Sequence, residues 1–457
     1  MKRTTGARFL RAGAALCLLG LGGAVGMGIL PWTVGPAAAR SYAVGPGRSL
    51  QTLSEVPWDD LLPGDVVRIQ GRGKPYREKV VIRRSGTKER PITIQGVPGP
   101  SGERPVLSGA GARHFQPLST PMKAARGLII LGDGQPANHV VIEGLEIRSA
   151  NNAERFKWGG AVMDYADNAA GVFVDKGTGV MVRKCAIHSC CMGVITGYFP
   201  DVGDFTLQSC HIYNNGDFTG SGWGHNVYLC ANRSWVQFNR FGELHSDGNN
   251  LKDRSGHTVI RYNWIEGGLS RQVDLVESEH YGRADAYVYG NVIAQGRKTV
   301  NPKMVLFGGD VGGSRKGTLY FFNNTVHAKA GKLHAFFFLN RPDCTATLKN
   351  NIFLGGPRIW MGQGAVSGSH NVFPYGADTR GFQAVLFGGE EQYVTLGPIP
   401  YMPHLQSLLV DRGTMDLPAA VRYMPTPFAG AMKRPFDGRI DIGAFELPKK
   451  RRARTGP

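Results

Sequence analysis

The six residues "IRYNWI" (260–265) contain a pattern that recurs along most of this chain. An apolar residue is followed by two variable residues, an Asn or a substitute, one more variable residue, and then Ile, Val or Phe. The fourth position of the successive copies is occupied by Leu145, Cys185, Cys210, Asn239, Asn263, Asn291, Asn324, Asn351 and Asn371. After Cys185, subtraction gives intervals of 25, 29, 24, 28, 33, 27 and 20 residues. Short apolar runs repeated at this period indicate a solenoid in which each copy forms one coil.

The recurrent Asn favours a parallel β-helix over other repeat folds. An Asn at the same corner of successive coils can donate its amide to a carbonyl of the next coil, which satisfies buried backbone groups of the turns. A β-propeller requires about 40 or more residues per blade at regular spacing, and the irregular intervals argue against it. The 64 glycines among 457 residues agree with many short strands and tight turns in one elongated domain.

Both ends of the chain differ from the repetitive part. Residues 1–39 combine a basic start, an apolar run and an Ala-x-Ala site, so we predict a signal peptide cleaved before Arg40. An uncleaved anchor is the alternative, because the apolar run from Ala12 to Leu30 is nearly long enough to span a bilayer. The β-helix domain is then expected over 40–447, followed by a basic, disordered tail over 448–457. A secreted or periplasmic protein is predicted.

The formal net charge is +18, and a positive balance remains when both termini are set aside. Outside the cytoplasm, such a charge suits an anionic polysaccharide better than nucleic acid. The alternative is a charge that serves solubility alone. We expect a monomer that contacts a membrane only if the N-terminal segment stays uncleaved.

Two further stretches support a resemblance to a known superfamily. The entry segment from Ser41 to Ile82 and the closing stretch "RPFDGRIDIGAFE" (434–446), together with the Asn ladder, resemble secreted proteins of the pectate-lyase-like superfamily. The resemblance implies an all-β fold, a single-stranded right-handed parallel β-helix, with "SLQTLSEVPWDDLL" (49–62) as an N-terminal capping helix. It does not imply one reaction, since the superfamily includes lyases, hydrolases, epimerases and proteins of no known activity.

The cysteines fit this frame. Cys185 and Cys210 occupy the ladder position, so we expect them to stack at one corner. Buried thiols are the favoured interpretation, and a disulfide across adjacent coils is the alternative, since the spacing of strands permits one. The six cysteines left after signal removal are Cys185, Cys190, Cys191, Cys210, Cys230 and Cys344.

The polar stretch "GNNLKDRSG" (248–256) gives the candidate site. The 24-residue offset between Asn239 and Asn263 pairs Tyr228 with Lys252. Strand side chains alternate between faces, and Asp253 falls at an inward position, which suggests that the strand ends at Lys252. If Val227 and Leu251 point inward, the outward side chains are Asn226, Tyr228, Asn250, Lys252 and Arg254.

Neighbouring segments add ionisable groups to the same edge. In "SRQVDLVES" (270–278), Asp274 is expected beside Lys252, with Glu277 at the strand end, and the corner "ELHSDG" (243–248) adds two further groups. The predicted catalytic residues are Lys252, Arg254, Asp274, Glu277 and His245. The predicted substrate-binding residues are His225, Asn226, Tyr228, Asn250 and Asp247.

This set suits cleavage of a uronate polymer by β-elimination. The proton α to the sugar carboxylate is removed easily only when that carboxylate is neutralised, and a Lys or Arg can act as the base. Lys252 is therefore predicted as base and Arg254 as carboxylate clamp. The asparagine–lysine run resembles the lysine-bearing strand of β-helix alginate and chondroitin lyases, which pair the lysine with an arginine one coil later. Here that position holds Asp274.

The resemblance also suggests calcium as a cofactor, but the oxygen ligands that calcium needs are not recognisable in the sequence, and the metal ligands stay unassigned. Lys252 and Asp274 could equally form a plain surface ion pair. Two other functions stay open. One is glycoside hydrolysis by a carboxylate pair from Asp274, Glu277 and Asp247. The other is non-catalytic carbohydrate binding on the aromatic residues Trp223, Tyr228, Trp235, Trp264 and Tyr281.

Overall fold

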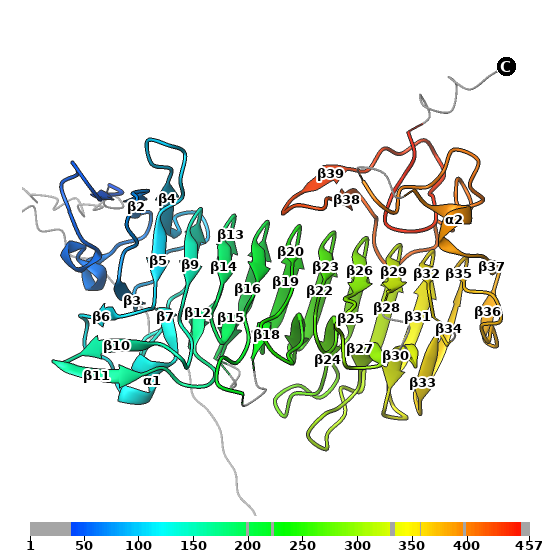
Figure 1. Cartoon of the computed structure of the whole chain (residues 1–457), viewed down its shortest axis with the longest axis horizontal. Helices are drawn as coiled ribbons and strands as arrows, with labels where there is room; N and C mark the ends of the chain where they lie inside the picture. Colours follow the sequence, from blue (N-terminus) through cyan, green and yellow to red (C-terminus); the bar gives the residue numbers. More distant parts are fainter. Residues whose placement is uncertain are drawn as a thin grey trace, which may run out of the picture. The chain divides into compact units, whose positions relative to one another are not determined.

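Short strands make up nearly all of the regular structure. The computed structural model describes residues 38–197, 201–220, 224–329, 334–356, 358–395 and 399–448. The predicted signal segment (apart from its last two residues), Trp223 and the basic tail (apart from its first residue) lie outside these ranges. In the unit that begins at Ala38, strands of successive coils lie side by side (Figure 1). No helix among the described residues is long and apolar enough to cross a membrane.

Three sheets run along this unit. In spatial order, the first sheet contains β1 (Ser41–Val44), β2 (Val66–Gln70), β4 (Ile92–Val97), β8 (Val140–Glu143), β13 (Val180–Arg183), β16 (Asp204–Gln208), β19 (Arg233–Gln237), β22 (His257–Arg261), β25 (Ala286–Tyr289), β28 (Thr318–Phe322), β31 (Thr345–Lys349), β34 (Ala365–Ser369) and β36 (Phe382–Gln383).

The second sheet contains β11 (Ala161–Asp164), β10 (Arg155–Trp158), β6 (Ala112–His114), β3 (Glu78–Ile82), β7 (Gly127–Leu131), β12 (Ala170–Val174), β15 (Met192–Thr196), β18 (His225–Leu229), β21 (Leu251–Asp253), β24 (Val273–Leu275), β27 (Lys303–Phe307), β30 (Ala335–Leu339) and β33 (Trp360–Gly362). The third contains β37 (Leu386–Phe387), β35 (Val372–Phe373), β32 (Ile352–Leu354), β29 (Thr325–Ala328), β26 (Val292–Gln295), β23 (Trp264–Glu266), β20 (Arg240–Phe241), β17 (His211–Tyr213), β14 (Ala186–His188), β9 (Glu146–Arg148) and β5 (Val106–Ser108).

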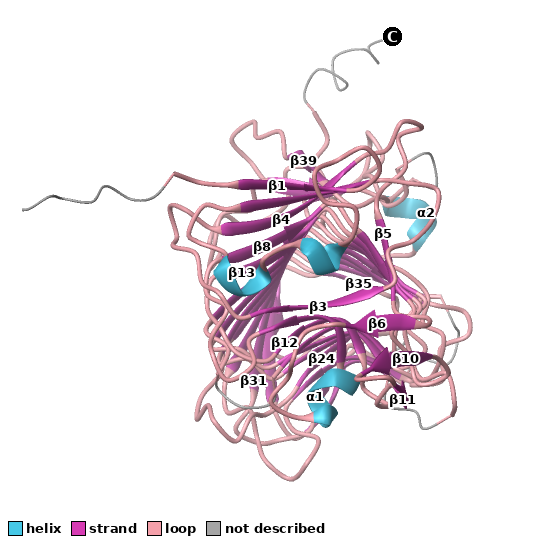
Figure 2. Cartoon of the chain, turned by 90° about the vertical axis from the view of Figure 1, so that its left-hand side faces the viewer, coloured by secondary structure: helices cyan, strands magenta, loops and turns pink. Residues whose placement is uncertain are grey.

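From β12 to β35 each coil contributes one strand to each sheet, and neighbouring coils pair in parallel, as β18 does with β21 and β21 with β24. Antiparallel pairs of strands join β10 to β11 and β38 (Tyr423–Pro425) to β39 (Ala431–Lys433). The view along the coils shows the sheets surrounding a central space that inward side chains fill with a continuous apolar core (Figure 2). The predicted parallel β-helix is thus confirmed.

The Asn ladder is present at the predicted corner. Asn263 donates its backbone N–H and its side-chain amide to Asn291 Oδ1, at 2.9 and 3.0 Å, and the same amide to the carbonyl of Val236. The bonds repeat from Asn239 to Asn371. The preceding residue, Tyr262 in this coil, has a positive φ of 57°, which turns the chain so that the amide points inward. Each Asn therefore satisfies a corner that the bend would leave unpaired.

The cysteines at the ladder position act as small stacked side chains. Cys210 takes part in the ladder through its backbone N–H, which donates to Asn239 Oδ1 at 2.9 Å. Cys185 and Cys210 are both buried and free, and all six cysteines of the described chain are free thiols. The interpretation as buried thiols is confirmed, and the alternative disulfide is not formed.

The entry segment closes the first coil without the expected amphipathic helix. It forms two 3₁₀ helices, Leu53–Glu55 and Trp58–Asp60, separated by Pro57. Pro57 disfavours the helical conformation of the residue before it, so one continuous helix does not form. Leu53 and Trp58 are still buried, and Glu78 accepts the backbone N–H of Leu53 at 2.9 Å. Two short α-helices lie elsewhere, α1 (Pro121–Ala125) and α2 (Glu390–Tyr393).

Candidate functional site

The predicted alignment of the central strands is correct. In the second sheet, Tyr228 of β18 lies opposite Lys252 of β21, and Lys252 lies opposite Asp274 of β24. Val227, Leu251 and the other inward residues are fully buried. Tyr228 and Lys252 therefore project from the same face of neighbouring coils, as the period-2 alternation of strands requires.

Lys252 is held between two carboxylates. Its ammonium forms an ion pair with Asp310 and lies 3.6 Å from Asp274 Oδ2. Asp274 is fully buried, where it also accepts the Asn249 amide at 2.8 Å and pairs with Arg271 at 3.2 Å. Burial raises the pKa of the Asp274 carboxyl, and the nearby Arg271 and Lys252 oppose that rise. The expected contact between Lys252 and Asp274 is present, but the nearer partner is Asp310.

Arg254 makes the densest set of polar contacts in the site. Its side chain is 5% exposed and donates through Nη2 to both oxygens of Asp310, at 2.6 and 2.8 Å. Its Nε donates to the Tyr228 hydroxyl at 2.9 Å, and its Nη1 donates to the Glu277 carbonyl at 2.5 Å. Burial alone would lower the pKa of Arg254, but Tyr228 and Asp310 together hold it above its ordinary value. The guanidinium is thus a fixed, bidentate carboxylate binder.

Asp310 is the residue that the sequence analysis missed. It belongs to the loop after β27 and reaches back to Lys252, which lies two coils earlier in the sheet. Burial would raise its pKa, but the hydrogen bonds and charges of Lys252 and Arg254 lower it below the ordinary value. The one signal for it was an acidic residue among glycines, "GGDVGG" (308–313), in a loop on the same sheet edge.

Glu277 positions that loop and does not face the pocket. Its carboxylate accepts the backbone N–H of Asp310 and of Val311, both at 2.8 Å, and that of Gly313 at 3.3 Å. The residue is 3% exposed. The predicted neighbourhood of Glu277 and Arg254 is observed, since Arg254 Nη1 lies 3.7 Å from Glu277 Oε2.

A pocket of about 460 Å³ opens above these groups. Lys252, Arg254 and Tyr228 contribute to one side, and residues of an earlier coil face them. The lining residues are Asp167, Asn168, Met192, Ile195, His225, Tyr228, Lys252, Arg254, Asp310 and Val311. The pocket therefore combines two cations, a phenol, an imidazole and two carboxylates in one cavity.

His225 lines this pocket as a neutral hydrogen-bond donor. Burial, followed by the charge of Lys252, lowers the pKa of His225 to about 3. Its Nδ1 accepts the backbone N–H of Asn249 at 3.0 Å. The ring proton consequently resides on Nε2. His225 thus offers an N–H and is a poor base.

Asn226 and Asn250 were expected to point outward, and that expectation is wrong. Both side chains are fully buried and form a second ladder. The Asn226 amide donates to Asn250 Oδ1 at 2.6 Å, and the Asn250 amide donates to Gln272 Oε1 at 2.8 Å. Asn250 lies at a bend before β21, whereas Asn226 lies within β18, where its amide also donates to the carbonyl of Gly242 at 3.1 Å. Strict alternation therefore fails inside β18 as well. Their amides support the coil beneath the site.

The strand does not end at Lys252, although Asp253 does point inward. Asp253 is fully buried, and it accepts the hydroxyls of Ser234 and Thr258 at 2.7 and 2.8 Å. The guanidinium of Arg315 is buried next to it, 3.9 Å from Asp253 Oδ1, and donates to surrounding carbonyls. A buried charge is tolerated here because each polar group is paired.

The remaining predicted residues lie apart from the pocket. His245 and Asp247 are exposed, and His245 stacks on Phe218 at 3.9 Å between ring centroids. Neither lines the cavity around Lys252. Among the aromatic residues proposed as sugar platforms, Tyr228 is in the pocket, while Trp264 is buried under the C-terminal segment.

The pocket residues do not fit a calcium ion. Asn226 and Asn250 direct their amide groups into the interior ladder. Asp274 and Asp310 are engaged by Arg271, Lys252 and Arg254, whose positive charges repel a cation. A calcium ion is therefore not assigned to this pocket.

A larger cavity, about 710 Å³, lies along the third sheet. Glu266 there is paired with Arg240 at 3.2 Å and with Lys329 at 3.0 Å. Within the predicted corner segment 243–248, only Glu243 lines this cavity. The cavity on the second sheet is the stronger candidate because it gathers a phenol, an imidazole and a carboxylate-binding guanidinium around one space.

No protein-family model matches the chain, and a search of curated proteins gives no match. Solved structures resemble it at low sequence identity. Pectate lyase Pel9A is 12% identical, with a TM-score of 0.53 over 91% of this chain and 98% of that one. A lacto-N-biosidase from Eubacterium ramulus is 15% identical, with a TM-score of 0.47 over 77% and 68%. An alginate lyase from a Paenibacillus species is 16% identical, with a TM-score of 0.43 over 71% and 99%. The likeness to pectate lyase Pel9A agrees with the parallel β-helix described above and concerns the fold alone.

Proposed function

We propose that this protein is a polysaccharide lyase that cleaves a uronate-containing polymer by β-elimination in the pocket around Lys252 and Arg254. One observation carries the proposal. Arg254 and Lys252 together hold the carboxylate of Asp310, with Arg254 contacting both oxygens at 2.6 and 2.8 Å. A sugar carboxylate that displaces the Asp310 side chain would find the same donors, Arg254 Nη2 and the Lys252 ammonium.

The chemistry requires that this carboxylate be neutralised. A base takes the proton on the carbon next to it, the electron pair forms a carbon–carbon double bond, and the glycosidic bond at the β-carbon breaks as its oxygen takes a proton. Positive charge at the carboxylate stabilises the developing negative charge. Arg254 and Lys252 supply that charge in a partly buried site, where it is screened less than in water.

The contacts suggest a revised division of roles. Lys252 is the cation of an ion pair with Asp310 and Asp274, so we assign it to carboxylate binding together with Arg254. The Tyr228 hydroxyl, 2.9 Å from Arg254 Nε, is the proposed proton-transfer group, because a guanidinium stabilises a phenolate. His225 directs its neutral N–H toward the pocket and binds a sugar oxygen.

Glycoside hydrolysis is the second candidate. Asp310 and Asp167 both line the cavity and come from different coils, as a pair acting on opposite sides of a sugar would. The pair differs from the one expected from sequence, since Asp274 and Glu277 are buried and committed to other partners.

The products separate these activities. The purified protein is incubated with pectate, alginate and glycosaminoglycans, and the absorbance of unsaturated uronate is followed together with reducing ends. We expect the chromophore to appear with one of these polymers. Tyr228→Phe should reduce kcat/KM by about 100-fold or more, the usual range for removing a proton-transfer group. Arg254→Lys, which keeps the charge but not the fork, should mainly raise KM.

Arg233→Ala is the matched control, because Arg233 forms an exposed pair with Asp204 outside the pocket. Its activity should equal that of the unmodified protein. Reducing ends without the chromophore, lost in Asp310→Asn and Asp167→Asn, would establish the hydrolase instead. Binding of one of these polymers without any product would indicate a non-catalytic carbohydrate-binding protein. We further propose that the protein acts outside the cytoplasm on such a polymer.

A further inference from the structure

The third sheet carries a cavity that the proposed reaction does not use. Its volume is about 710 Å³. The strands beside it, β20, β23, β26 and β29, belong to four successive coils and lie side by side (Figure 1). None of the residues that line this cavity also lines the pocket around Lys252. The two cavities therefore use separate sets of side chains.

Glycines from three successive coils form one wall of the cavity. Gly242, Gly267 and Gly296 line it, and each directly follows a strand of the third sheet. A Cβ added at Gly267 would lie 3.0 Å from the Cα of Glu243, and one added at Gly296 would lie 3.1 Å from the Cα of Gly267. At these corners the coils are too close for side chains, so the wall consists of bare backbone.

Glu266 holds two cations of the cavity in place. Its Oε2 accepts the indole N–H of Trp264 at 2.9 Å and lies 3.2 Å from Arg240 Nη2, and its Oε1 lies 3.0 Å from the Lys329 ammonium. Burial would raise the pKa of Glu266, but the Trp264 hydrogen bond and the charges of Lys329 and Arg240 lower it below the ordinary value. Arg240 and Lys329 are thus positioned before any ligand arrives.

Two further cations of the cavity lack a counter-ion in the chain. Arg297 and Lys298 follow β26, are exposed, and form no ion pair among the residues that the structure describes. Burial, followed by the charge of Lys329, lowers the pKa of His327 to about 4, so His327 adds no charge at neutral pH. The four Arg and Lys side chains therefore outnumber the two carboxylates of the cavity, which belong to Glu243 and Glu266.

This mixture of charges favours a sugar acid over a compact anion. Phosphate would be attracted by the cations, but its two charges would be repelled by Glu243 and Glu266. A uronic-acid sugar carries one carboxylate and several hydroxyls. Cations can bind its carboxylate, while carboxylates of the protein accept its hydroxyl groups.

We propose that this cavity is a second, non-catalytic binding site for a uronic-acid residue of an anionic polysaccharide. Arg297 and Lys298 bind the carboxylate, and Glu243 and Glu266 accept sugar hydroxyls. The ligand class rests on the proposed function, whereas the residues are different. A polymer bound both here and at the pocket is held at two points, which strengthens binding through the effective concentration of the second contact.

The test is electrophoresis of the native protein through gels that contain pectate, alginate or neutral dextran, at physiological ionic strength. Retardation measures binding and needs no turnover. We expect pectate or alginate, but not dextran, to retard the protein. Arg297→Ala/Lys298→Ala should raise the dissociation constant by about tenfold, equivalent to about 1.4 kcal/mol. Both side chains are exposed, so the fold should be unaffected. Lys298→Ala alone provides a second variant.

Lys88→Ala/Arg358→Ala is the matched control. It removes the same charge from two exposed residues that do not line the cavity, and it should bind like the unmodified protein. Equal losses in the two double variants would overturn the proposal, because binding would then follow net charge. No retardation by either acidic polymer would also refute it. The same holds if phosphate at matched ionic strength displaces the polymer as well as free galacturonate does.

Tyr228→Phe separates this proposal from the proposed function. It should lose turnover at the pocket and keep the retardation. If no polymer gives the unsaturated product, the proposed function fails, and the retardation still decides the role of this cavity. If Arg254→Lys loses the retardation and Arg297→Ala/Lys298→Ala keeps it, the polymer binds at the pocket alone and the second site is ruled out.

Discussion

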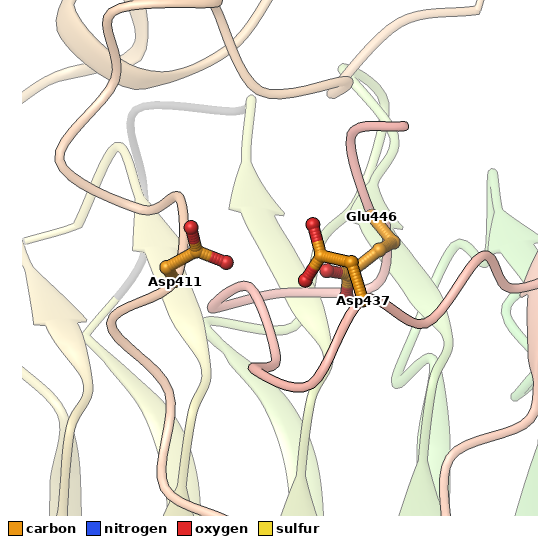
Figure 3. Close-up of side chains that lie close together, drawn as sticks. All are labelled: Asp411, Asp437 and Glu446. Atoms are coloured by element: carbon orange, nitrogen blue, oxygen red, sulfur yellow. The ribbon is translucent and has the colours of Figure 1, made fainter. Parts of the chain in front are cut away.

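Two groups of charged residues in this molecule differ in how their charge is balanced. At the pocket, Lys252 and Arg254 face Asp274, Asp310 and Glu277, so that cations and carboxylates alternate in space. At the closing segment, Asp411, Asp437 and Glu446 face one another (Figure 3). In the first group the carboxylates share Lys252 and Arg254, whereas in the second Arg434 pairs with one oxygen of Glu446 and the other oxygen, Oε1, has no hydrogen bond within the described chain.

The difference indicates different uses. A cluster whose charges are paired within the chain keeps its side chains in fixed positions. Replacing one of its carboxylates by the carboxylate of a ligand costs little free energy, which suits substrate binding. At the closing segment the Arg434–Glu446 pair is buried, which suits a structural role. The predictions that follow disturb the charges of the pocket.

The largest effect is expected from removing the central cation of the pocket. Arg254→Ala leaves Asp310 with Lys252 as its remaining cation and removes the cation beside the buried Glu277, so the free energy of unfolding should fall by about 3–5 kcal/mol. Urea denaturation measures it. The exposed Arg233→Ala should change that free energy by no more than about 1 kcal/mol. Similar losses in both variants would show that burial of the pair is unimportant.

Removing the negative charge of Asp310 should strengthen the binding of an anionic ligand to the pocket. Asp310→Asn removes the carboxylate that Lys252 and Arg254 share, so affinity for a small uronate should rise by about tenfold, equivalent to about 1.4 kcal/mol. Calorimetric titration with galacturonate measures this change. Asp204→Asn, outside the pocket, is the control. Unchanged or weaker binding in Asp310→Asn would mean that the two cations are not the carboxylate site.

The same aspartate should give a smaller effect that depends on pH. Its folded-state pKa is lowered, because hydrogen bonds from Lys252 and Arg254 outweigh burial. Its contribution to stability is therefore complete above the unfolded pKa of about 3.9 and is lost as the pH falls through the folded value. The difference in thermal midpoint between the unmodified protein and Asp310→Asn should be constant from pH 5 upward and shrink below pH 4. A difference that grows toward acid would contradict the assignment.

Much of the central architecture could be predicted because it depends on local chemistry repeated in register. The Asn position fixes one corner of each coil, and the 24-residue offset between Asn239 and Asn263 fixes which residues of β18 and β21 lie opposite one another. That offset placed Lys252 between Tyr228 and Asp274 correctly. Residues that are one repeat apart along the chain lie opposite one another in neighbouring coils, so those contacts could be predicted from the sequence alone.

Other features depended on groups that no repeat brings together. Asn226 and Asn250 look like outward positions in the strand pattern, yet both side chains are buried and their amides form a ladder with Gln272. Asp253 looked like the end of a strand, and Arg315, from a loop more than two coils later, makes its burial possible. A prediction based on alternation fails for these residues because their hydrogen-bond partners lie far along the chain.

The sequence by itself determined the β-helix, its corner ladder and the stacking of Tyr228, Lys252 and Asp274, because each follows from short-range periodicity. Only the tertiary structure decided what surrounds them. Asp310 reaches Lys252 from a loop whose length and path carry no repeat, and Glu446 meets Asp411 across the closing segment. Such long-range contacts decide how charges are paired, so the pairing in the pocket and at the closing segment became visible only in the folded chain.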